Sequence, residues 1–94
     1  MNKIVVSSKF KRTFRKFVRR DRPLQIRVEK TIEDLSDDIY NPSLGTHKLE
    51  GKLSGLLSCS CGYDCRIVFA IEKDEGSGET AIVLLDVGTH DEVY

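Results

Sequence analysis

The sequence is poor in the residues from which metal and redox sites are built. Its 94 residues include two histidines, three cysteines, one methionine and no tryptophan. The cysteines, Cys59, Cys61 and Cys65, are an odd number crowded into seven residues, which is a poor framework for disulfide bonds. They also make a poor zinc site, because structural zinc normally has four ligands, commonly paired as C-x₂₋₄-C with a second pair elsewhere. We therefore expect no metal, no cofactor and no redox role, and expect Cys59 and Cys61 to share the core-facing side of a strand.

Long hydrophobic runs are also missing. The run Ala81–Leu85 is far too short to cross a bilayer, and the N-terminus lacks the hydrophobic region of a signal peptide. We therefore expect a cytoplasmic protein without a membrane partner. A chain of this length is enough for one modest core, so residues 1–94 are expected to form a single domain.

The formal net charge of zero conceals a strong asymmetry. Residues 1–30 carry eleven Lys or Arg against two acids, a net charge of 11 − 2 = +9. Residues 31–94 carry four bases against thirteen acids, a net charge of 4 − 13 = −9. The distribution of charge, rather than its total, therefore indicates which partners the chain binds.

The first half has the pattern of a strand followed by two helices. The β-branched residues 4–6 indicate a short strand, and Ser7 or Ser8 is suited to cap the helix that follows. Apolar residues form one face of that helix at positions i, i+4, i+7 and i+8, namely Phe10, Phe14, Phe17 and Val18. Pro23 suits the first turn of a second helix. The apolar stripe of this second helix is Leu24, Val28, Ile32 and Leu35.

The second half changes to a period of two. Alternating residues from 53 to 61 predict a strand, 62–64 a turn, and 65–72 and 80–87 two more strands joined by a polar loop. The predicted fold class is α+β, with the order β-α-α-β-β-β and an antiparallel sheet packed against the N-terminal helical hairpin. The last two strands are apolar on both faces, so the face away from the helices is either a groove wall or a docking surface.

The last seven residues follow the final strand directly. They place the imidazole of His90 and the phenol of Tyr94 four residues apart, at the edge of a rigid sheet. Histidine is the usual general acid or base near neutral pH. This placement suits an enzyme that transfers protons.

Several segments together carry a family resemblance: residues 10–14, Asn41-Pro42, residues 47–55, residues 64–69 and residues 88–94. In their order and spacing the chain resembles the RelE/ParE superfamily of toxins from type II toxin–antitoxin systems, and within it the YafQ-like mRNA interferases with histidine active sites. The resemblance covers essentially the whole chain. It implies a ribosome-dependent endoribonuclease that cuts translated mRNA in the ribosomal A site, and a cognate antitoxin protein as partner.

The resemblance also implies an active site. Metal-free RNA cleavage uses the substrate 2′-hydroxyl as nucleophile and needs a base, an acid and positive charge near the phosphate. His47 and His90 match active-site positions, with His90 expected as the general acid. Arg66 matches a phosphate-stabilising arginine, Asp64 a carboxylate that is either a base or an orienter of a histidine, and Tyr94 a terminal aromatic that stacks on a base or donates a hydrogen bond. The remaining candidate is Lys52, which adds positive charge.

One position departs from the YafQ pattern. Counting without gaps from His47 puts Ser60 where YafQ has a further active-site histidine, and a hydroxyl does not replace an imidazole as an acid or base near pH 7. Either two histidines and Asp64 suffice, or the activity is reduced.

The first predicted helix is basic opposite its apolar stripe. Such a face is usually solvated surface, but here it carries almost one sign of charge over its whole length, which favours binding to the phosphates of ribosomal RNA. The residues expected to bind RNA are Lys9, Lys11, Arg12, Arg15, Lys16, Arg19 and Lys52.

Two alternatives remain at this stage. The first is a ParE-like toxin with the same fold, no nuclease activity and DNA gyrase as its target. The second is a catalytically weak member that only binds antitoxin. The set of His47, Arg66, His90 and Tyr94 argues against the gyrase alternative, because ParE-like chains lack it.

Overall fold

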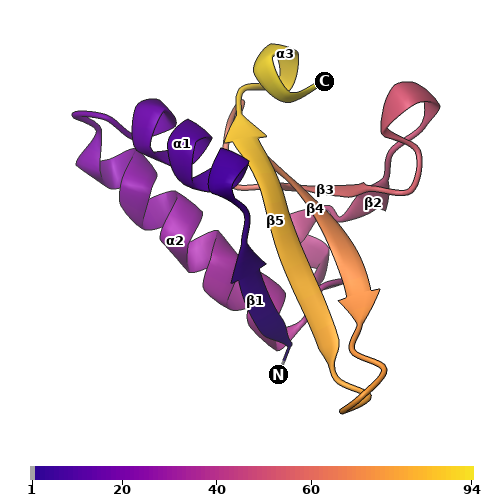
Figure 1. Cartoon of the computed structure of the whole chain (residues 1–94). Coiled ribbons are helices and arrows are strands. Elements are labelled where there is room, and N and C mark those ends of the chain that lie inside the picture. Colours follow the sequence, from indigo (N-terminus) through magenta and orange to yellow (C-terminus); the bar gives the residue numbers. More distant parts are fainter. Residues whose placement is uncertain (1) are drawn as a thin grey trace.

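The computed structural model describes residues 2–94. In chain order the elements are β1 (Lys3–Val6), α1 (Ser8–Phe17), α2 (Arg22–Asp37), the 3₁₀ turn η1 (Pro42–Leu44), β2 (His47–Lys48), the 3₁₀ turn η2 (Gly51–Leu53), β3 (Leu57–Ser60), β4 (Arg66–Lys73), β5 (Thr80–Gly88) and α3 (His90–Val93). The strands form a five-stranded sheet in the order β1-β5-β4-β3-β2, and both long helices lie on one side of it (Figure 1). The predicted α+β class is confirmed.

The sheet is mixed. Strands β2 to β5 pair antiparallel with their neighbours, as the predicted meander requires. Strand β1 instead pairs parallel to β5, with Lys3 opposite Ala81 and Val6 opposite Leu84. Parallel neighbours need a long crossover connection, and here everything from α1 to β4 separates the two strands.

Both long helices begin at side-chain caps. The Ser7 hydroxyl accepts a hydrogen bond from the backbone N of Phe10 at 3.0 Å, and the Asp21 carboxylate accepts one from Leu24 at 3.1 Å. Pro23 lies in the first turn of α2, as predicted, where its missing N–H leaves no acceptor unpaired. None of the helices in residues 2–94 is long and apolar enough to cross a membrane.

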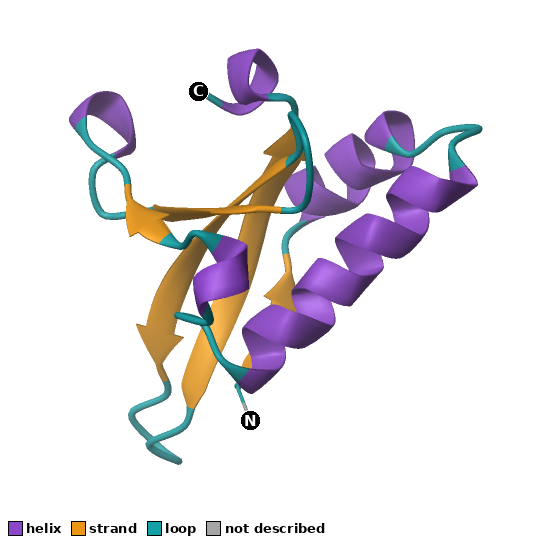
Figure 2. Cartoon of the chain, turned by 180° about the vertical axis from the view of Figure 1, so that it is seen from behind, coloured by secondary structure: helices purple, strands orange, loops and turns teal. Residues whose placement is uncertain are grey.

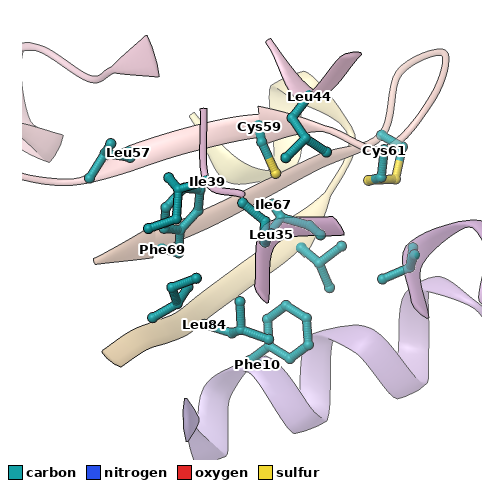
Figure 3. Packing of buried hydrophobic residues seen from close by; sticks show 14 of the residues in the cluster. Phe10, Leu35, Ile39, Leu44, Leu57, Cys59, Cys61, Ile67, Phe69 and Leu84 are labelled. Atoms are coloured by element: carbon teal, nitrogen blue, oxygen red, sulfur yellow. A yellow bond between two sulfur atoms is a disulfide. The ribbon is translucent and has the colours of Figure 1, made fainter. Parts of the chain in front are cut away.

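The core lies between the two long helices and one face of the sheet. Figure 2 shows from behind that both long helices lie together on the same side of the strands. Phe10 and Leu35 from the helices meet Ile67, Phe69 and Leu84 from the strands (Figure 3). Because side chains alternate along a strand, the neighbours of these core residues point away from the helices. We call that second surface the open face; on β3 and β4 its residues are Ser58, Ser60, Arg66 and Val68.

The segment from 53 to 61 differs from the prediction. Residues Gly51–Leu53 form a 3₁₀ turn, and the strand begins only at Leu57. Gly51 and Gly55 have φ angles of +69° and +94°, in a region that breaks an extended strand. A two-residue strand, His47–Lys48, occupies the sheet edge beside β3.

The expectation for the cysteines was wrong in one respect. Cys61 and Cys65 form a disulfide, with their Cα atoms 5.0 Å apart. The turn between β3 and β4 brings the two residues face to face, a geometry that a count of cysteines does not reveal. Cys59 remains a free thiol, fully buried in the core as predicted.

Candidate active site

Helix α3 carries His90 and Tyr94. Thr89 caps it reciprocally: the Thr89 hydroxyl accepts from the backbone N of Glu92 at 3.3 Å, and the Glu92 carboxylate accepts from the backbone N of Thr89 at 2.9 Å. A Cβ atom added to Gly88 would lie 3.2 Å from the Glu92 Cβ, so glycine lets the helix fold closely against the strand end. The Thr89-x-x-Glu92 spacing is the sequence signal from which this helix could have been predicted.

Asp64 ties this helix to the β3–β4 turn. It has a φ of +49°, and its Oδ1 accepts a hydrogen bond from the backbone N of His90 at 3.0 Å. A carboxylate at this position satisfies a free N–H of the first helical turn. Asp64 therefore contacts the backbone of His90 and not its imidazole, which is the geometry of a residue that orients the histidine.

The rings of His90 and Tyr94 are in direct contact. Their centroids lie 4.6 Å apart and the ring planes make an angle of 87°, an edge-to-face arrangement. The His90 side chain is 60% exposed, and its Nδ1 lies 3.5 Å from the carboxylate of the fully exposed Asp91. Such an exposed pair contributes little free energy. The imidazole is thus held from one side and open to solvent on the other.

Tyr94 is anchored to β3 by a hydrogen bond between its phenol oxygen and the hydroxyl of Ser58, which is fully buried. His47 lies directly opposite Ser58 in the β2–β3 ladder, so its side chain projects from the same face of the sheet. The His47 ring is exposed, with Nδ1 3.0 Å from the carbonyl oxygen of Gly45. Ser58 therefore lies between two of the predicted site residues, although the sequence pattern gave no sign of its role.

Lys52 comes close to Tyr94 from the loop after β2. The two residues line a shallow hollow of about 270 Å³ together with Leu49, Glu50 and Leu53. In Figure 1 this loop rises beside β3 toward the end of the sheet where α3 stands. The loop thus brings an exposed ammonium group to the same end of the molecule as the C-terminal helix.

Arg66 is fixed at the start of β4. Its Nη1 donates to the carbonyl oxygens of Cys65 at 2.9 Å and Gly62 at 3.2 Å, and lies 3.4 Å from the Ser60 hydroxyl. Within residues 2–94 its Nη2 and Nε make no hydrogen bond. Ser60, the residue at the position of the missing histidine, thus contacts the guanidinium. These contacts fix the position of Arg66 and leave its Nη2 and Nε groups free to donate hydrogen bonds to an anion.

Asp64, His90 and Tyr94 are thus linked by direct contacts at one end of the open face. Arg66 lies opposite Gly88 in the β4–β5 ladder, next to the residue from which α3 departs. His47 projects from the same face through the edge strand β2. This arrangement combines two imidazoles, a phenol and a guanidinium, which are groups suited to move protons and to stabilise negative charge.

The basic residues on and just after α1 form a second surface, which adjoins α3 because Lys9 and Lys16 line a hollow together with Glu92. Five of the predicted RNA-binding residues lie on α1 and Arg19 lies in the turn after it, and all six are exposed. Lys9 lies 3.4 Å from the Asp86 carboxylate, whereas the other five have no ion pair within residues 2–94. We call these five the basic patch: Lys11, Arg12, Arg15, Lys16 and Arg19. Four of them, Arg12, Arg15, Lys16 and Arg19, line one hollow of about 420 Å³ and are therefore close neighbours on the surface.

Comparison with known proteins decides the family. The profile of one family, described as the YafQ bacterial toxin of type II toxin–antitoxin systems, matches residues 2–94. The chain belongs to the YafQ toxin family. All the predicted site residues lie inside the part that matches YafQ toxins. No curated protein sequence matches the chain.

Solved structures share the fold of this YafQ-family toxin. A mutant YafQ from E. coli has a TM-score of 0.79 at 11% identity and covers 100% of this chain and 99% of its own. A metal-bound toxin from Helicobacter pylori has a TM-score of 0.76 at 25% identity, with 100% of both chains covered. YafQ in the E. coli DinJ–YafQ complex has a TM-score of 0.73 at 12% identity, covering 100% and 99%.

Proposed function

We propose that this YafQ-family toxin is a ribosome-dependent mRNA endoribonuclease that stops translation. The observation that supports the proposal most is the gathering of Asp64, Arg66, His90 and Tyr94 around α3, with His47 on the same face of the sheet. The reaction class follows from the side chains, since they offer a proton donor, a proton acceptor and a fixed positive charge.

In the proposed mechanism the 2′-hydroxyl of the mRNA attacks the adjacent phosphorus and the 5′-oxygen leaves. His90 protonates the leaving 5′-oxygen as general acid. His47, whose side chain is exposed on the same face, accepts the 2′-hydroxyl proton as general base. The free donors of Arg66 bind the non-bridging phosphate oxygens as negative charge develops on them. The products are a 2′,3′-cyclic phosphate and a 5′-hydroxyl.

Binding to the ribosome falls to the basic patch. Four of its five cations lie on α1 and Arg19 follows it directly, and Lys16 lines a hollow with Glu92 of α3, so the patch and the acid–base groups can contact the same RNA. Neutralising RNA phosphates releases counterions, which makes binding strong at low salt and weak at high salt. Lys52, beside Tyr94, adds charge where the mRNA backbone passes the site.

We further propose that a cognate antitoxin neutralises this chain. The E. coli relative is solved as a DinJ–YafQ complex. In this chain a hollow of about 320 Å³ lies on the open face beneath α3, bordered by five apolar residues, Leu53, Leu56, Val68, Leu85 and Val93, and by Ser7 and the Lys9–Asp86 ion pair. An antitoxin with apolar side chains for this hollow and acidic side chains for α1 would cover both surfaces.

The test is cleavage of mRNA on purified translating ribosomes. We expect the protein to cut and His90→Ala to cut at least about a hundredfold more slowly, the usual effect of losing a general acid. The control is Glu75→Ala, an exposed acidic residue in the β4–β5 hairpin far from α3, which should cut at the normal rate. Intact mRNA together with failing DNA supercoiling would instead support the gyrase alternative.

A further inference from the structure

We propose that Ser58 is a positioning residue of the active site, acting on catalysis through Tyr94. The proposal rests on the proposed nuclease function and adds a residue that no motif identified. Ser58 lies in β3, is fully buried, and shares a hydrogen bond with the phenol of Tyr94, 36 positions away in sequence.

The burial of this hydroxyl calls for an explanation. Within residues 2–94 only two polar side chains are buried, Thr31 and Ser58. Thr31 donates to the carbonyl oxygen of Arg27, four residues back in its own helix, at 2.9 Å, which is ordinary local pairing. Ser58 has only the distant Tyr94 as side-chain partner. A buried hydroxyl without a hydrogen-bond partner is unfavourable, so a serine at position 58 requires the phenol of Tyr94 as its partner.

The hydrogen bond matters because α3 is too short to hold itself. A helix of four residues is not stable alone in water. Asp64 fixes its first residue, through the backbone N of His90, and Ser58 fixes the residue after its end, through the phenol of Tyr94. The His90 ring then leans edge-on against the Tyr94 ring. Ser58 therefore sets the direction in which the imidazole points.

The two hydroxyls also form a relay of hydrogen bonds. Each has one proton and two lone pairs, and Ser58, being buried, can exchange hydrogen bonds only with its protein neighbours. When a phosphate oxygen of the mRNA accepts the phenol proton as a hydrogen bond, Ser58 turns to donate to the phenol oxygen. No proton leaves either residue; the second bond strengthens the first by polarising it.

The test compares Ser58→Ala, Tyr94→Phe and the double variant in single-turnover cleavage on ribosomes. We expect Ser58→Ala to cut about tenfold more slowly, the factor for one hydrogen bond, at an unchanged half-saturating ribosome concentration. Tyr94→Phe should cut at least as slowly, because it also removes the phenol proton that the mRNA phosphate accepts. The double variant should be no slower than Tyr94→Phe, because both changes remove the same bond. The control Thr31→Val removes the other buried hydroxyl and should cut at the normal rate.

A normal rate in Ser58→Ala, or effects that multiply in the double variant, would overturn the proposal while leaving the nuclease function intact. If the unaltered protein does not cut, the nuclease proposal fails, and NMR of protein with ¹³C-labelled tyrosine and histidine decides on Ser58. We then expect Ser58→Ala to shift the Tyr94 Cζ and His90 ring signals and to leave those of Tyr40 and Tyr63 in place. Unchanged Tyr94 and His90 signals would refute the positioning role.

Discussion

Opening the Cys61–Cys65 disulfide should destabilise this toxin by an amount that the structure sets. The bond closes a loop of five residues, because the cysteines are four positions apart. A closed loop of this length restricts the unfolded chain by about 7 cal/mol/K, or about 2 kcal/mol of folding free energy at 25 °C. For a domain of this size that corresponds to a fall of roughly 8–16 °C in melting temperature.

The assay is urea unfolding with and without a phosphine reductant, with mass spectrometry to confirm the state of the thiols. The double variant Cys61→Ser/Cys65→Ser should lose at least as much stability, because its two hydroxyls are buried, and should be insensitive to the reductant. Since the loop also carries Asp64, the amide of His90 should exchange with deuterium faster once the bond is open. Equal stability of the verified oxidised and reduced forms would refute the loop-closure reasoning.

Three further predictions concern particular side chains. Burial raises the pKa of the Cys59 thiol from 9.0 to about 12. The neutral thiol therefore contributes to the free energy of unfolding below pH 9.0, and this contribution is lost as the pH rises toward 12. Urea unfolding at increasing pH should show this loss, and Cys59→Ala should lack it. Asp64→Asn keeps an oxygen that can accept from the backbone N of His90 and should retain most of the cleavage activity, whereas Asp64→Ala should lose most of that activity. An equal loss of activity in both variants would indicate that the carboxylate acts as a base. Changing Arg12 and Arg15 to Gln should flatten the log–log salt dependence of ribosome binding by about one to two units, whereas Lys73→Gln on the far β4–β5 hairpin should not.

Local patterns in the sequence were sufficient to predict most of the fold. The spacing of Phe10, Phe14 and Phe17 identified α1, and Pro23 marked the start of α2, because helix faces and caps depend on neighbours within a few residues. The parallel pairing of β1 with β5 could not be predicted in this way. It joins residues about 78 positions apart, such as Lys3 and Ala81, and depends on how the whole chain packs.

The candidate site divides along the same line. The motifs identified His47, Asp64, Arg66, His90 and Tyr94, and their roles in catalysis remain predictions. Their geometry depends on contacts that no pattern encodes: the carboxylate of Asp64 on the backbone of His90, and the phenol of Tyr94 on a buried serine. The disulfide was missed for a similar reason, since only the β3–β4 turn shows that two of the three cysteines face each other.

The most direct measurement maps the mRNA ends produced on ribosomes that hold a defined codon in the A site. The account predicts one cut within that codon, leaving a 2′,3′-cyclic phosphate upstream and a 5′-hydroxyl downstream, and no cut when the nucleotide before the scissile bond lacks its 2′-hydroxyl. Uncut mRNA in the presence of folded toxin would contradict the account. So would a 5′-phosphate at the cut, or cleavage that persists without the 2′-hydroxyl.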